Sequence, residues 1–269
     1  MLKNLIIDFM FLWNKYYFVC QQKSPLRMVV DSIMKRVNTE TAYNRKILVL
    51  DGPNGSDKFK EILPAYKAKR GSKEHVYFDI DKCLQEISQR YPDIVILRAP
   101  NWEADQVIAA LASIYSKKGE HTEIFSGDKD LLQLMSFDNV IVTETYKDTF
   151  KLQPYKKEIT LARFKSDAVK EYSDIIKYRI FKGDASDGIP VAIPRLSTST
   201  INTIVENWEG TEFNLEDIEE NVPYKEQKKF ELYKENLERN WNLMQLIKLP
   251  NKKIIEETEV YKQDGFQAI

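Results

Sequence analysis

The sequence predicts an α/β protein in which a mostly parallel central sheet is flanked by helices. Short apolar runs alternate along the chain with longer stretches whose apolar residues recur at helical spacing, an order typical of parallel sheets. The chain has 269 residues and is 43% hydrophobic, with only 9 glycines and 10 prolines, so it can bury a large core. Several of the apolar runs end at an acidic residue, which places carboxylates at the rim of the expected sheet.

Composition excludes several classes of protein. The formal net charge is -1, a balance that leaves room for a basic patch on one face. Two cysteines, Cys20 and Cys83, are too few for a disulfide framework, and two histidines, His75 and His121, make a zinc cluster improbable. Residues 1–20 are apolar but interrupted by polar residues, so we expect neither a signal peptide nor a membrane span. These features predict a cytoplasmic protein with reduced cysteines.

The expected strands are short apolar runs bounded by polar residues. They cover residues 4–7, 47–50, 94–97, 123–125 and 140–143. The expected helices carry apolar side chains three or four positions apart. They cover residues 9–19, 25–37, 74–90 and a stretch that opens within 99–112. Residues 145–153 are expected to add a hairpin at the edge of the sheet.

Beyond Pro154 the alternation of strand and helix stops. Helical patterns continue at residues 169–182, 196–207 and 225–249, and the tail from Asn251 is expected to be a loose strand or loop. We therefore predict two domains. An α/β core covers residues 1–165, and a helical region covers residues 166–269.

Residues 121–134, HTEIFSGDKDLLQL, are the stretch around which this interpretation is built. The strand-like run ends in a loop that carries Asp128 and Asp130. In open α/β sheets ligands bind just beyond the carboxyl ends of the strands. Two carboxylates this close repel each other unless a cation or a proton lies between them. The alternative is a solvated loop that happens to be acidic.

Other acidic residues occupy comparable positions. Asp8 and Asp51 each follow a buried strand. Glu103 and Asp105 open a helix, and their spacing allows a shared metal site only at the irregular first turn. The alternative for this pair is that both complement the helix dipole.

A further acidic pair occurs in the sequence KGDASDGIP. Asp184 and Asp187 are three positions apart, so a helical turn or tight loop directs both side chains the same way. The alternative is that Asp184 or Ser186 caps the next element.

Two segments have the character of phosphate-binding sites. Residues 58–73 carry six cations that suit contacts with phosphates, and the ring of Tyr66 among them suits stacking on bases. These residues are Lys58, Lys60, Lys67, Lys69, Arg70, Lys73 and Tyr66. The alternative is a solvated helix face. The helix expected at residues 196–207 starts with serines and threonines that present backbone N–H groups to a phosphate. In this segment we expect Arg195, Ser197 and Thr198 to contact nucleic acid.

Five motifs, taken together, resemble the 5′ nuclease family. They are LIID, LVLDG, NWEADQVIA, SGDKDLLQL and KGDASDGIP, in this order. The family includes the 5′→3′ exonuclease domains of bacterial repair polymerases, flap endonucleases and phage enzymes described as ribonuclease H. The resemblance covers residues from about 3 to the end of the 180s, and more loosely to Pro250. It implies a PIN-like 5′ nuclease fold, with a helical arch at about residues 67–90 and a C-terminal helical region that grips duplex DNA through a modified helix-hairpin-helix.

The resemblance also implies a metal centre. In the family, a cluster of carboxylates holds two Mg²⁺ ions, for which Mn²⁺ can substitute. The matching residues here are Asp8, Asp51, Glu103, Asp105, Asp128, Asp130, Asp184 and Asp187. Two ions about 4 Å apart provide hydroxide at neutral pH and stabilise both the attacking and the leaving oxygen of phosphodiester hydrolysis.

The roles of individual residues follow from the same resemblance. Glu103, Asp128 and Asp130 are expected nearest one ion. Asp184 and Asp187 are expected nearest the other ion, while Asp8 and Asp51 hold water or complete the first site. ILPAYKAKR resembles the YKxNR element at the foot of the arch, so Lys67 and Arg70 are the expected contacts to the scissile phosphate.

Three departures from the family pattern stand out. Gln106 replaces a carboxylate of the usual EADD sequence, so the site loses a charge. VAIPRLSTSTI stands where the family often has a glycine-rich hairpin, which leaves K⁺ binding and the grip on duplex open. No arginine closely follows Asp8. Together with the absence of an attached polymerase, these departures are typical of a compact phage enzyme, which would act in the host cytoplasm.

We therefore expect a metal-dependent, structure-selective 5′ nuclease that removes flaps or RNA primers during replication. The expected partners are branched or nicked DNA and RNA–DNA duplex with a free 5′ end, and a replication polymerase or single-strand-binding protein. We expect a monomer without membrane contact. Two alternatives are a junction-binding protein of the same fold with weakened catalysis and a PIN-type ribonuclease.

Overall fold

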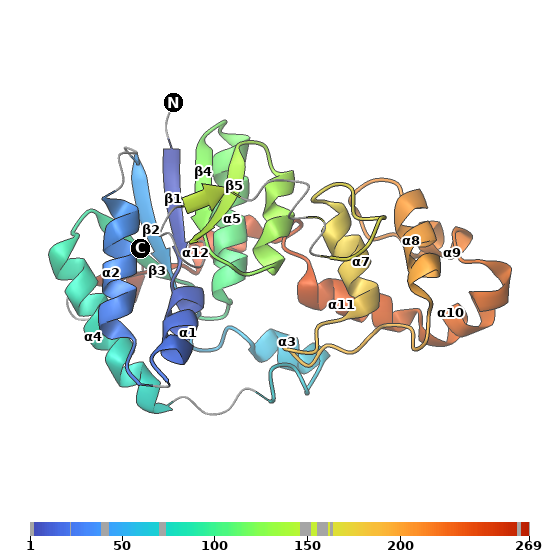
Figure 1. The fold of residues 1–269 in the computed structure, drawn as a ribbon, viewed down its shortest axis with the longest axis horizontal. Coiled ribbons are helices and arrows are strands. Elements are labelled where there is room, and N and C mark those ends of the chain that lie inside the picture. Colours follow the sequence, from blue (N-terminus) through green and yellow to red (C-terminus); the bar gives the residue numbers. More distant parts are fainter. Residues whose placement is uncertain are drawn as a thin grey trace. The chain divides into compact units, whose positions relative to one another are not determined.

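The computed structural model describes most of the chain in two compact units (Figure 1). The described residues are 3–21, 23–38, 43–69, 74–145, 152–154, 161, 164–262 and 265–268. The first unit consists of Met1–Asp57, Gly71–Pro154 and Leu249–Ile269. The second consists of Lys58–Arg70 and Tyr155–Lys248. None of the helices in these ranges combines the length and the apolar character needed to cross a membrane.

The first unit contains an 8-stranded sheet in the order β6-β5-β4-β1-β2-β3-β7-β8. Its strands are β1 (Lys3–Asp8), β2 (Arg45–Val49), β3 (Ile94–Arg98), β4 (His121–Phe125), β5 (Val140–Thr145), β6 (Leu152–Pro154), β7 (Glu259–Lys262) and β8 (Gly265–Ala268). The five strands from β5 to β3 in this order are parallel, and β6, β7 and β8 pair antiparallel at the two sides. The predicted mostly parallel sheet is therefore confirmed.

The order of the parallel strands sets the position of a binding site. The chain proceeds from β1 to β2 and β3 on one side, and then returns to β4 on the other side of β1. Strand order thus reverses at β1, and the register places Ile7 beside both Leu48 and Phe125. The crevice at such a reversal, beyond the carboxyl ends of the strands, is where doubly wound sheets bind ligands.

Helices cover both faces of this sheet because successive strand residues point to opposite sides. One core joins residues of β1 such as Leu5 and Ile7 to apolar side chains of α1 (Phe9–Val19), α2 (Leu26–Val37) and α4 (Glu74–Arg90). The other face is covered by α5 (Ala104–Lys117), which contacts β4, β1 and β2. The 3-10 helix η1 (Asp130–Ser136) contacts α5 and β5.

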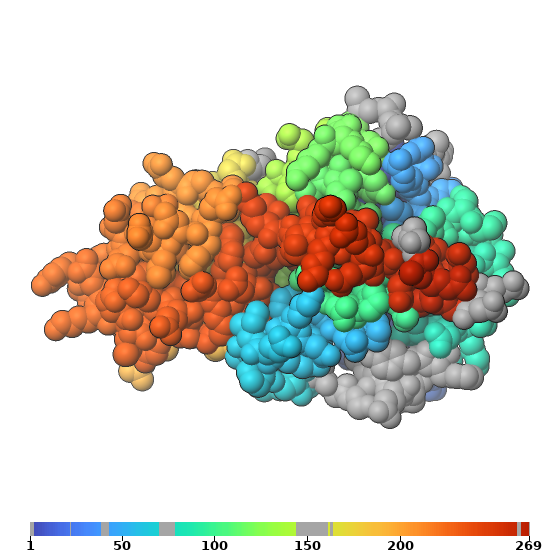
Figure 2. Space-filling view, turned by 180° about the vertical axis from the view of Figure 1, so that it is seen from behind, coloured from blue at the N-terminus to red at the C-terminus, as the bar shows by residue number. Residues whose placement is uncertain are grey.

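The C-terminal segment completes the first unit, contrary to the expectation of a loose tail. Helix α12 (Asn251–Glu256) packs on α5, and the β7–β8 hairpin extends the sheet from β3. In the space-filling view, this red segment lies on the outside of the molecule (Figure 2). The second segment of the first unit ends at Pro154, whereas the predicted boundary is residue 165, and Leu249–Ile269 belong to the first unit.

The arch predicted at about residues 67–90 is wrong in its C-terminal half. Four residues of α4 are buried in the core against α2, which leaves no free arch there. They are Ile80, Cys83, Leu84 and Ile87. Residues 70–73 lie outside the described part of the chain.

The second unit is helical, as expected, but its helices differ in length from the predicted ones. They are α3 (Asp57–Ile62, from Lys58 on), α7 (Asp174–Lys182), α8 (Thr198–Asn207), α9 (Leu215–Glu220), η2 (Tyr224–Glu226), α10 (Gln227–Tyr233) and α11 (Glu235–Met244). The single helix predicted at 225–249 is broken between α10 and α11, and Leu232 of its expected apolar stripe is 73% exposed. An aromatic cluster of Trp208, Phe213 and Trp241 joins α8 to α11.

Candidate metal centre

Asp8 lies where β1 ends and α1 begins, and its side chain is held from two directions. Its Oδ1 accepts a hydrogen bond from the backbone N–H of Phe11 at 2.9 Å, so that Asp8 caps α1. Its Oδ2 accepts a hydrogen bond from the hydroxyl of Ser126 at 2.7 Å. Ser126 follows β4, the neighbouring strand, and both residues are buried. The reversal point of the sheet therefore holds a buried, oriented carboxyl group.

The electrostatic environment of Asp8 favours its protonated form. Burial raises the pKa of the Asp8 carboxyl from 3.8 to about 7. The hydrogen bonds from Phe11 and Ser126 lower this pKa, but they do not offset burial. The negative charges of Asp128 and Asp51 raise it further. Three carboxylates at the ends of adjacent strands thus repel one another, and a cation near them would relieve the repulsion.

Asp51, after β2, binds the start of α5. Its Oδ1 accepts a hydrogen bond from the backbone N–H of Ala104 at 2.7 Å, one of the N–H groups left open at a helix N-terminus. The next residue must be glycine, because a Cβ on Gly52 would lie 2.0 Å from the carbonyl oxygen of Ala99. The LVLDG motif therefore fixes the position of α5 relative to β2.

Glu103 and Gln106 form a reciprocal capping box at the N-terminus of α5. The Glu103 side chain accepts from the backbone N–H of Gln106, and the Gln106 side chain accepts from the backbone N–H of Glu103 at 3.2 Å. Both residues are buried. The residue that departs from the EADD pattern thus has a structural role, since glutamine completes a capping box as glutamate does. Asp105 lies in the first turn of the same helix.

Asp128 and Asp130 form a tight loop after β4. The N–H of Asp128 donates to the Ser126 hydroxyl at 3.1 Å, and the N–H of Asp130 donates to Oδ1 of Asp128 at 2.9 Å. Asp130 then opens η1. Ser126 therefore links the Asp8 carboxyl to the backbone of the acidic loop after β4.

The described residues do not contain a ready-made metal cage. Within them, no three acidic, imidazole or thiol side chains form a group that could hold a metal ion by themselves. The predicted cluster of eight carboxylates around two ions, many of them acting through water, stays a prediction. The donor set still fits a hard divalent cation, because it consists of carboxylate oxygens, and Mg²⁺ keeps several water molecules between itself and such ligands. Burial is the main cause of the raised pKa of Asp8, and the charges of Asp128 and Asp51 add to it, a repulsion that a cation would relieve.

Asp184, in the second unit, is held in a short hairpin loop after α7. Its backbone forms two hydrogen bonds with Ile189, both at 2.8 Å. Its side chain accepts from the N–H and the hydroxyl of Ser186, and it forms an ion pair with Arg179 at 2.5 Å. Burial would raise the pKa of Asp184, but the Ser186 hydrogen bonds and the Arg179 charge outweigh burial and lower it. Asp184 therefore orders its own loop through Ser186, and its assignment to a metal site stays a prediction.

Asp187, from the same loop, contacts the basic segment within the second unit. Its Oδ2 lies 3.8 Å from Nζ of Lys67 and accepts a hydrogen bond from the hydroxyl of Tyr66 at 3.5 Å. The two acids of KGDASDGIP thus have different partners. The prediction that this pair shares a centre with the acids of the first unit stays a prediction.

The residues predicted to contact nucleic acid differ in their positions and exposure. Lys58 and Lys60 belong to α3, Lys69 and Arg195 are exposed, and Ser197 caps α8 by accepting from the N–H of Thr200. Thr198 is the first residue of α8 and is exposed. Arg70 and Lys73 lie outside the described residues.

The prediction that the ring of Tyr66 is available for stacking is wrong in this structure. Its side chain is only 3% exposed and packs against Phe59 with ring centroids 5.0 Å apart. Sequence reasoning also missed the roles of Ser126 and Arg179. Ser126 precedes an acidic loop, and Arg179 lies about one helical turn before the GDxSD sequence. Neither position predicts a role by itself, because the partners of these residues are apparent only in three dimensions.

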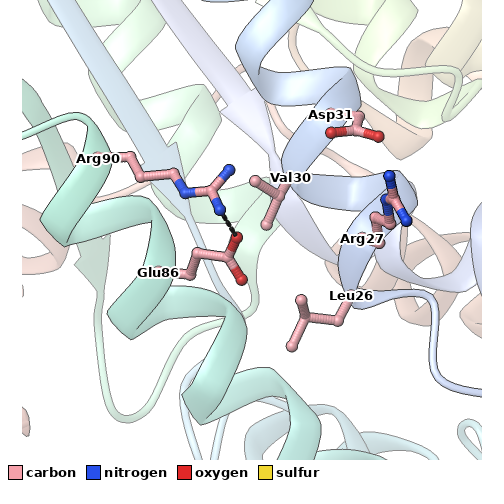
Figure 3. Close-up of a pocket in the computed structure, with 6 residues that line it drawn as sticks. All are labelled: Leu26, Arg27, Val30, Asp31, Glu86 and Arg90. Atoms are coloured by element: carbon pink, nitrogen blue, oxygen red, sulfur yellow. Dashed lines mark ion pairs between the residues drawn. The ribbon is translucent and has the colours of Figure 1, made fainter.

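Two surface pockets lie elsewhere in the first unit. One, of about 350 Å³, lies between α2 and α4 (Figure 3) and is lined by Leu26, Arg27, Val30, Asp31, Glu86 and Arg90. There Arg90 forms an ion pair with Glu86 at 2.7 Å. The other, of about 550 Å³, is lined by residues at the start of β4 and β5, including His121, Phe137 and Val140. Neither of these two pockets contains a predicted site residue.

The fold and the acidic rim define a class of α/β proteins that carry a carboxylate site at the reversal point of a parallel sheet. The family model described as 5′-3′ exonuclease, N-terminal resolvase-like domain, matches residues 3–172. The chain belongs to this family. The alternative of an unrelated PIN-type ribonuclease is not favoured by this match.

Similar proteins agree with this assignment. A 5′-3′ exonuclease of Aquifex aeolicus is 32% identical over 172 residues, which cover 61% of this chain and 56% of that protein. DNA polymerase I of Bacillus subtilis is 31% identical over 215 residues, which cover 75% of this chain and 24% of the polymerase. The chain thus spans about half of the first relative and a quarter of the second.

Solved structures show the same fold at low sequence identity. The T5 D15 protein, co-crystallized with metal ions, has a TM-score of 0.69 at 17% identity, and the match covers 95% of this chain and 92% of that one. The catalytic core of Rad2 in complex with a DNA substrate has a TM-score of 0.52 at 17% identity, covering 88% and 73%.

Proposed function

We propose that this protein is a divalent-metal-dependent 5′ nuclease that hydrolyses phosphodiester bonds near the 5′ ends of branched, nicked or primed DNA. One observation carries the proposal. Asp8 is buried at the reversal point of the sheet, and its pKa is raised to about 7 by burial and by the carboxylates that follow the two neighbouring strands. A protein keeps such mutual repulsion at the carboxyl edge of a sheet when a cation binds there.

The proposed cofactor is Mg²⁺, with Mn²⁺ as a substitute, bound by water and by carboxylates of the first unit. When bound, two such ions supply hydroxide at neutral pH and stabilise the negative charge of the transition state. The residues proposed for the first site are Asp8, Asp51, Glu103, Asp105, Asp128 and Asp130. Asp184 and Asp187 are proposed for the second. We do not extend the proposal to K⁺.

In the protein without a ligand, hydrogen bonds already hold the proposed carboxylate ligands in place. Ser126 fixes the orientation of Asp8 by donating to its Oδ2. Asp51 and the capping box fix the N-terminus of α5, whose dipole favours negative charge nearby. Lys67 and Arg70 are proposed to neutralise the scissile phosphate, because a fixed cation stabilises the charge that develops on it.

The substrate and partners are proposed from the relatives. A structure of the T5 D15 flap endonuclease holds DNA and metal ions, and the Rad2 core was solved with a DNA substrate. Because one set of relatives is named DNA polymerase I, we propose that this chain acts in replication, where it removes flaps or RNA primers beside a polymerase or a single-strand-binding protein. We propose that it acts as a monomer.

The test is cleavage of 5′-labelled flap, nicked and RNA-primed duplexes by the wild type and by Asp8→Asn, in Mg²⁺ and in EDTA. We expect the wild type to release short 5′ products only in Mg²⁺. We expect Asp8→Asn to cleave at least 100-fold more slowly while it binds the flap with similar affinity, since one carboxylate oxygen is lost. Tight binding of flap DNA without cleavage by the wild type would instead support a junction-binding protein, and equal cleavage in EDTA would refute metal dependence.

A further inference from the structure

Two segments that are distant in the sequence form one structural part within the second unit. The backbone N–H of Lys67 donates to the carbonyl oxygen of Asp187 at 2.8 Å. A Cβ on Gly188 would lie 2.6 Å from the carbonyl oxygen of Ala65, so only glycine allows this approach. Lys67 itself has a φ of 53°, in the left-handed region that non-glycine residues rarely adopt. Residues 65–67 are therefore fixed to the loop that carries Asp184 and Asp187.

The side chains strengthen this connection at one carboxylate. The hydroxyl of Tyr66 and the ammonium group of Lys67 both approach Oδ2 of Asp187, at 3.5 Å and 3.8 Å. The Lys67 ammonium also lies 4.9 Å from the centroid of the Tyr66 ring. Phe59 also packs against this ring, which is almost fully buried. The Tyr66 hydroxyl and the Lys67 ammonium group thus meet at one oxygen of Asp187.

Such an arrangement orients both charged groups. A carboxylate that accepts a hydrogen bond from a fixed hydroxyl has fewer orientations available, and a lysine over an aromatic face is restricted in the same way. A group that is already oriented loses less conformational entropy when it binds its ligand. The hydroxyl of Tyr66 can restrict the orientation of the Asp187 carboxylate. The ring of Tyr66 without its hydroxyl can restrict only the Lys67 side chain.

We propose that Tyr66 is a positioning residue whose hydroxyl holds Asp187 beside Lys67, so that a cation-binding carboxylate and a phosphate-binding lysine act as one preassembled part. This inference rests on the proposed function, because that function gives Asp187 and Lys67 their roles. In this proposal Tyr66, the tyrosine of the YKAKR element, contacts the Asp187 carboxylate and does not stack on a base of the nucleic acid. The two roles of Tyr66 predict different results when only the hydroxyl is removed.

The test compares Tyr66→Phe with the wild type. Calorimetric titration of Mn²⁺ into the DNA-free protein should show a weaker second binding event, with a dissociation constant raised about 3- to 10-fold, a change within the range for loss of an ordinary hydrogen bond. Single-turnover cleavage of flap DNA should slow by a similar factor in kcat, with KM unchanged. Tyr178→Phe is the matched control, because Tyr178 is another buried tyrosine of the same unit, and we expect it to behave as the wild type.

A second variant tests the backbone connection. Gly188→Ala would push residues 65–67 away from the loop, and we expect it to weaken Mn²⁺ binding at least as much as Tyr66→Phe. If Tyr66→Phe binds Mn²⁺ and cleaves as the wild type does, while Tyr66→Leu loses affinity for flap DNA, the ring stacks on a base and the inference is wrong. If the wild type does not cleave, the proposed function fails, but weaker Mn²⁺ binding by Tyr66→Phe would still support the positioning role.

Discussion

At Asp8, burial and hydrogen bonding act in opposite directions on the same carboxyl group. Two donors, the Phe11 N–H and the Ser126 hydroxyl, stabilise the carboxylate, but removal from water and two nearby acids favour the neutral form more strongly. The folded protein without a cation therefore carries a carboxyl group that loses its proton only near neutral pH. Its negative charge above that pH destabilises the fold unless a cation is bound.

This imbalance predicts a pH-dependent effect of Asp8→Asn on stability. The pKa of Asp8 is about 7 in the folded protein and 3.8 when unperturbed, so the folded state binds more protons and stability falls as pH rises between these values. Asp8→Asn removes the charge, so in EDTA it should stabilise the protein at pH 8 by up to about 4 kcal/mol, and by much less near pH 4. Urea unfolding at both pH values measures this difference.

Added Mg²⁺ provides the control for this prediction. A cation bound near Asp8 should stabilise the wild type and leave Asp8→Asn nearly unchanged, so the difference between the two proteins should shrink. A variant that is less stable than the wild type at pH 8 in EDTA would show that the Asp8 charge is not unfavourable in the folded state.

The positions of the acids could be predicted from the sequence, but their partners could not. Asp8, Asp51 and Asp128 each follow an apolar run, and parallel strands bring such positions to one edge of a sheet. In contrast, the hydrogen bond of Ser126 to Asp8 joins residues 118 positions apart. Hydrogen bonds between distant elements depend on the register of the strands, which no local pattern specifies.

At the scale of single elements, helix α5 shows how a departure from the family pattern is accommodated. The sequence suggested that Gln106 only removes a charge, whereas the structure uses its amide oxygen to cap the helix. We predict that Gln106→Ala lowers the free energy of unfolding by about 1 kcal/mol, the usual effect of losing a helix cap. Gln106→Glu should retain the cap and the stability, because glutamate fits the same box.

Thermal unfolding in EDTA measures these differences, and Gln227→Ala is the matched control. Gln227 is an exposed glutamine in the first turn of α10. Equal unfolding temperatures for Gln106→Ala and Gln227→Ala would show that the capping box does not stabilise α5.

Strand β4 is joined to helix α2 by a buried ion pair. Glu123 pairs with Arg36, and also with Lys3 at 2.8 Å. It accepts hydrogen bonds from Tyr43 at 3.0 Å and from Thr143 at 2.8 Å. Burial would raise the pKa of Glu123, but the Arg36 charge and the hydrogen bonds from Lys3 and Thr143 outweigh burial and lower the pKa.

We predict that Glu123→Gln destabilises the protein by about 3–5 kcal/mol at pH 7, because Arg36 stays buried without its counter-charge. The pKa of Glu123 is lowered, so its contribution is present above the ordinary glutamate value and is lost as pH falls through the folded value. The difference between wild type and variant should therefore shrink in acid. Guanidinium unfolding at pH 7 and pH 4 tests this, and an equal difference at both would assign the effect to packing alone.

Most elements of the sheet could be predicted, and the exceptions have a common cause. The parallel strands and α1, α2, α4 and α5 have strong periodicity or long apolar runs. The β7–β8 hairpin has short strands with only half-buried side chains, so its pattern is weak. The long helix expected at 225–249 was wrong because charged residues of high helix propensity continue across the break at Lys234.

At the scale of the whole molecule, the first unit is closed by the end of the chain. Ile254 of α12 is completely buried, Asn251 donates to the Ser113 hydroxyl of α5 at 2.9 Å, and Glu257 accepts from the indole N–H of Trp102 at 2.8 Å. Trp102 directly precedes the capping residue Glu103. The C-terminal segment therefore supports the helix that carries part of the candidate site.

This connection predicts that a chain ending at Leu249 is severely destabilised. Its α5 would expose the apolar face that α12 covers, and β3 would present an open edge prone to aggregation. A chain ending at Lys262 keeps α12 and β7, so it is the control and should remain folded. Circular dichroism and gel filtration compare the two, and a folded, monodisperse protein ending at Leu249 would show that the segment is dispensable.

The division of the chain into units could be predicted only in part. The change from alternating elements to helices after Pro154 is visible in the composition, and it coincides with the end of the first unit's second segment. The return of residues from Leu249 to the first unit, and the clustering of Lys58–Arg70 with the second, depend on contacts between distant segments. Sequence periodicity indicates only local structure, so it does not predict that a segment packs with a unit that is distant in the sequence.

We propose that carboxylates at the ends of β1, β2 and β4 bind a divalent cation needed for phosphodiester cleavage. Anomalous X-ray scattering from crystals grown with Mn²⁺ tests it most directly, with flap cleavage measured on the same preparation. We predict a manganese peak among Asp8, Asp51 and Asp128 in the wild type and a weakened or missing peak in Asp8→Asn, which should also fail to cleave. Rapid cleavage by a wild-type protein whose crystals show no manganese near these three carboxylates would contradict the account.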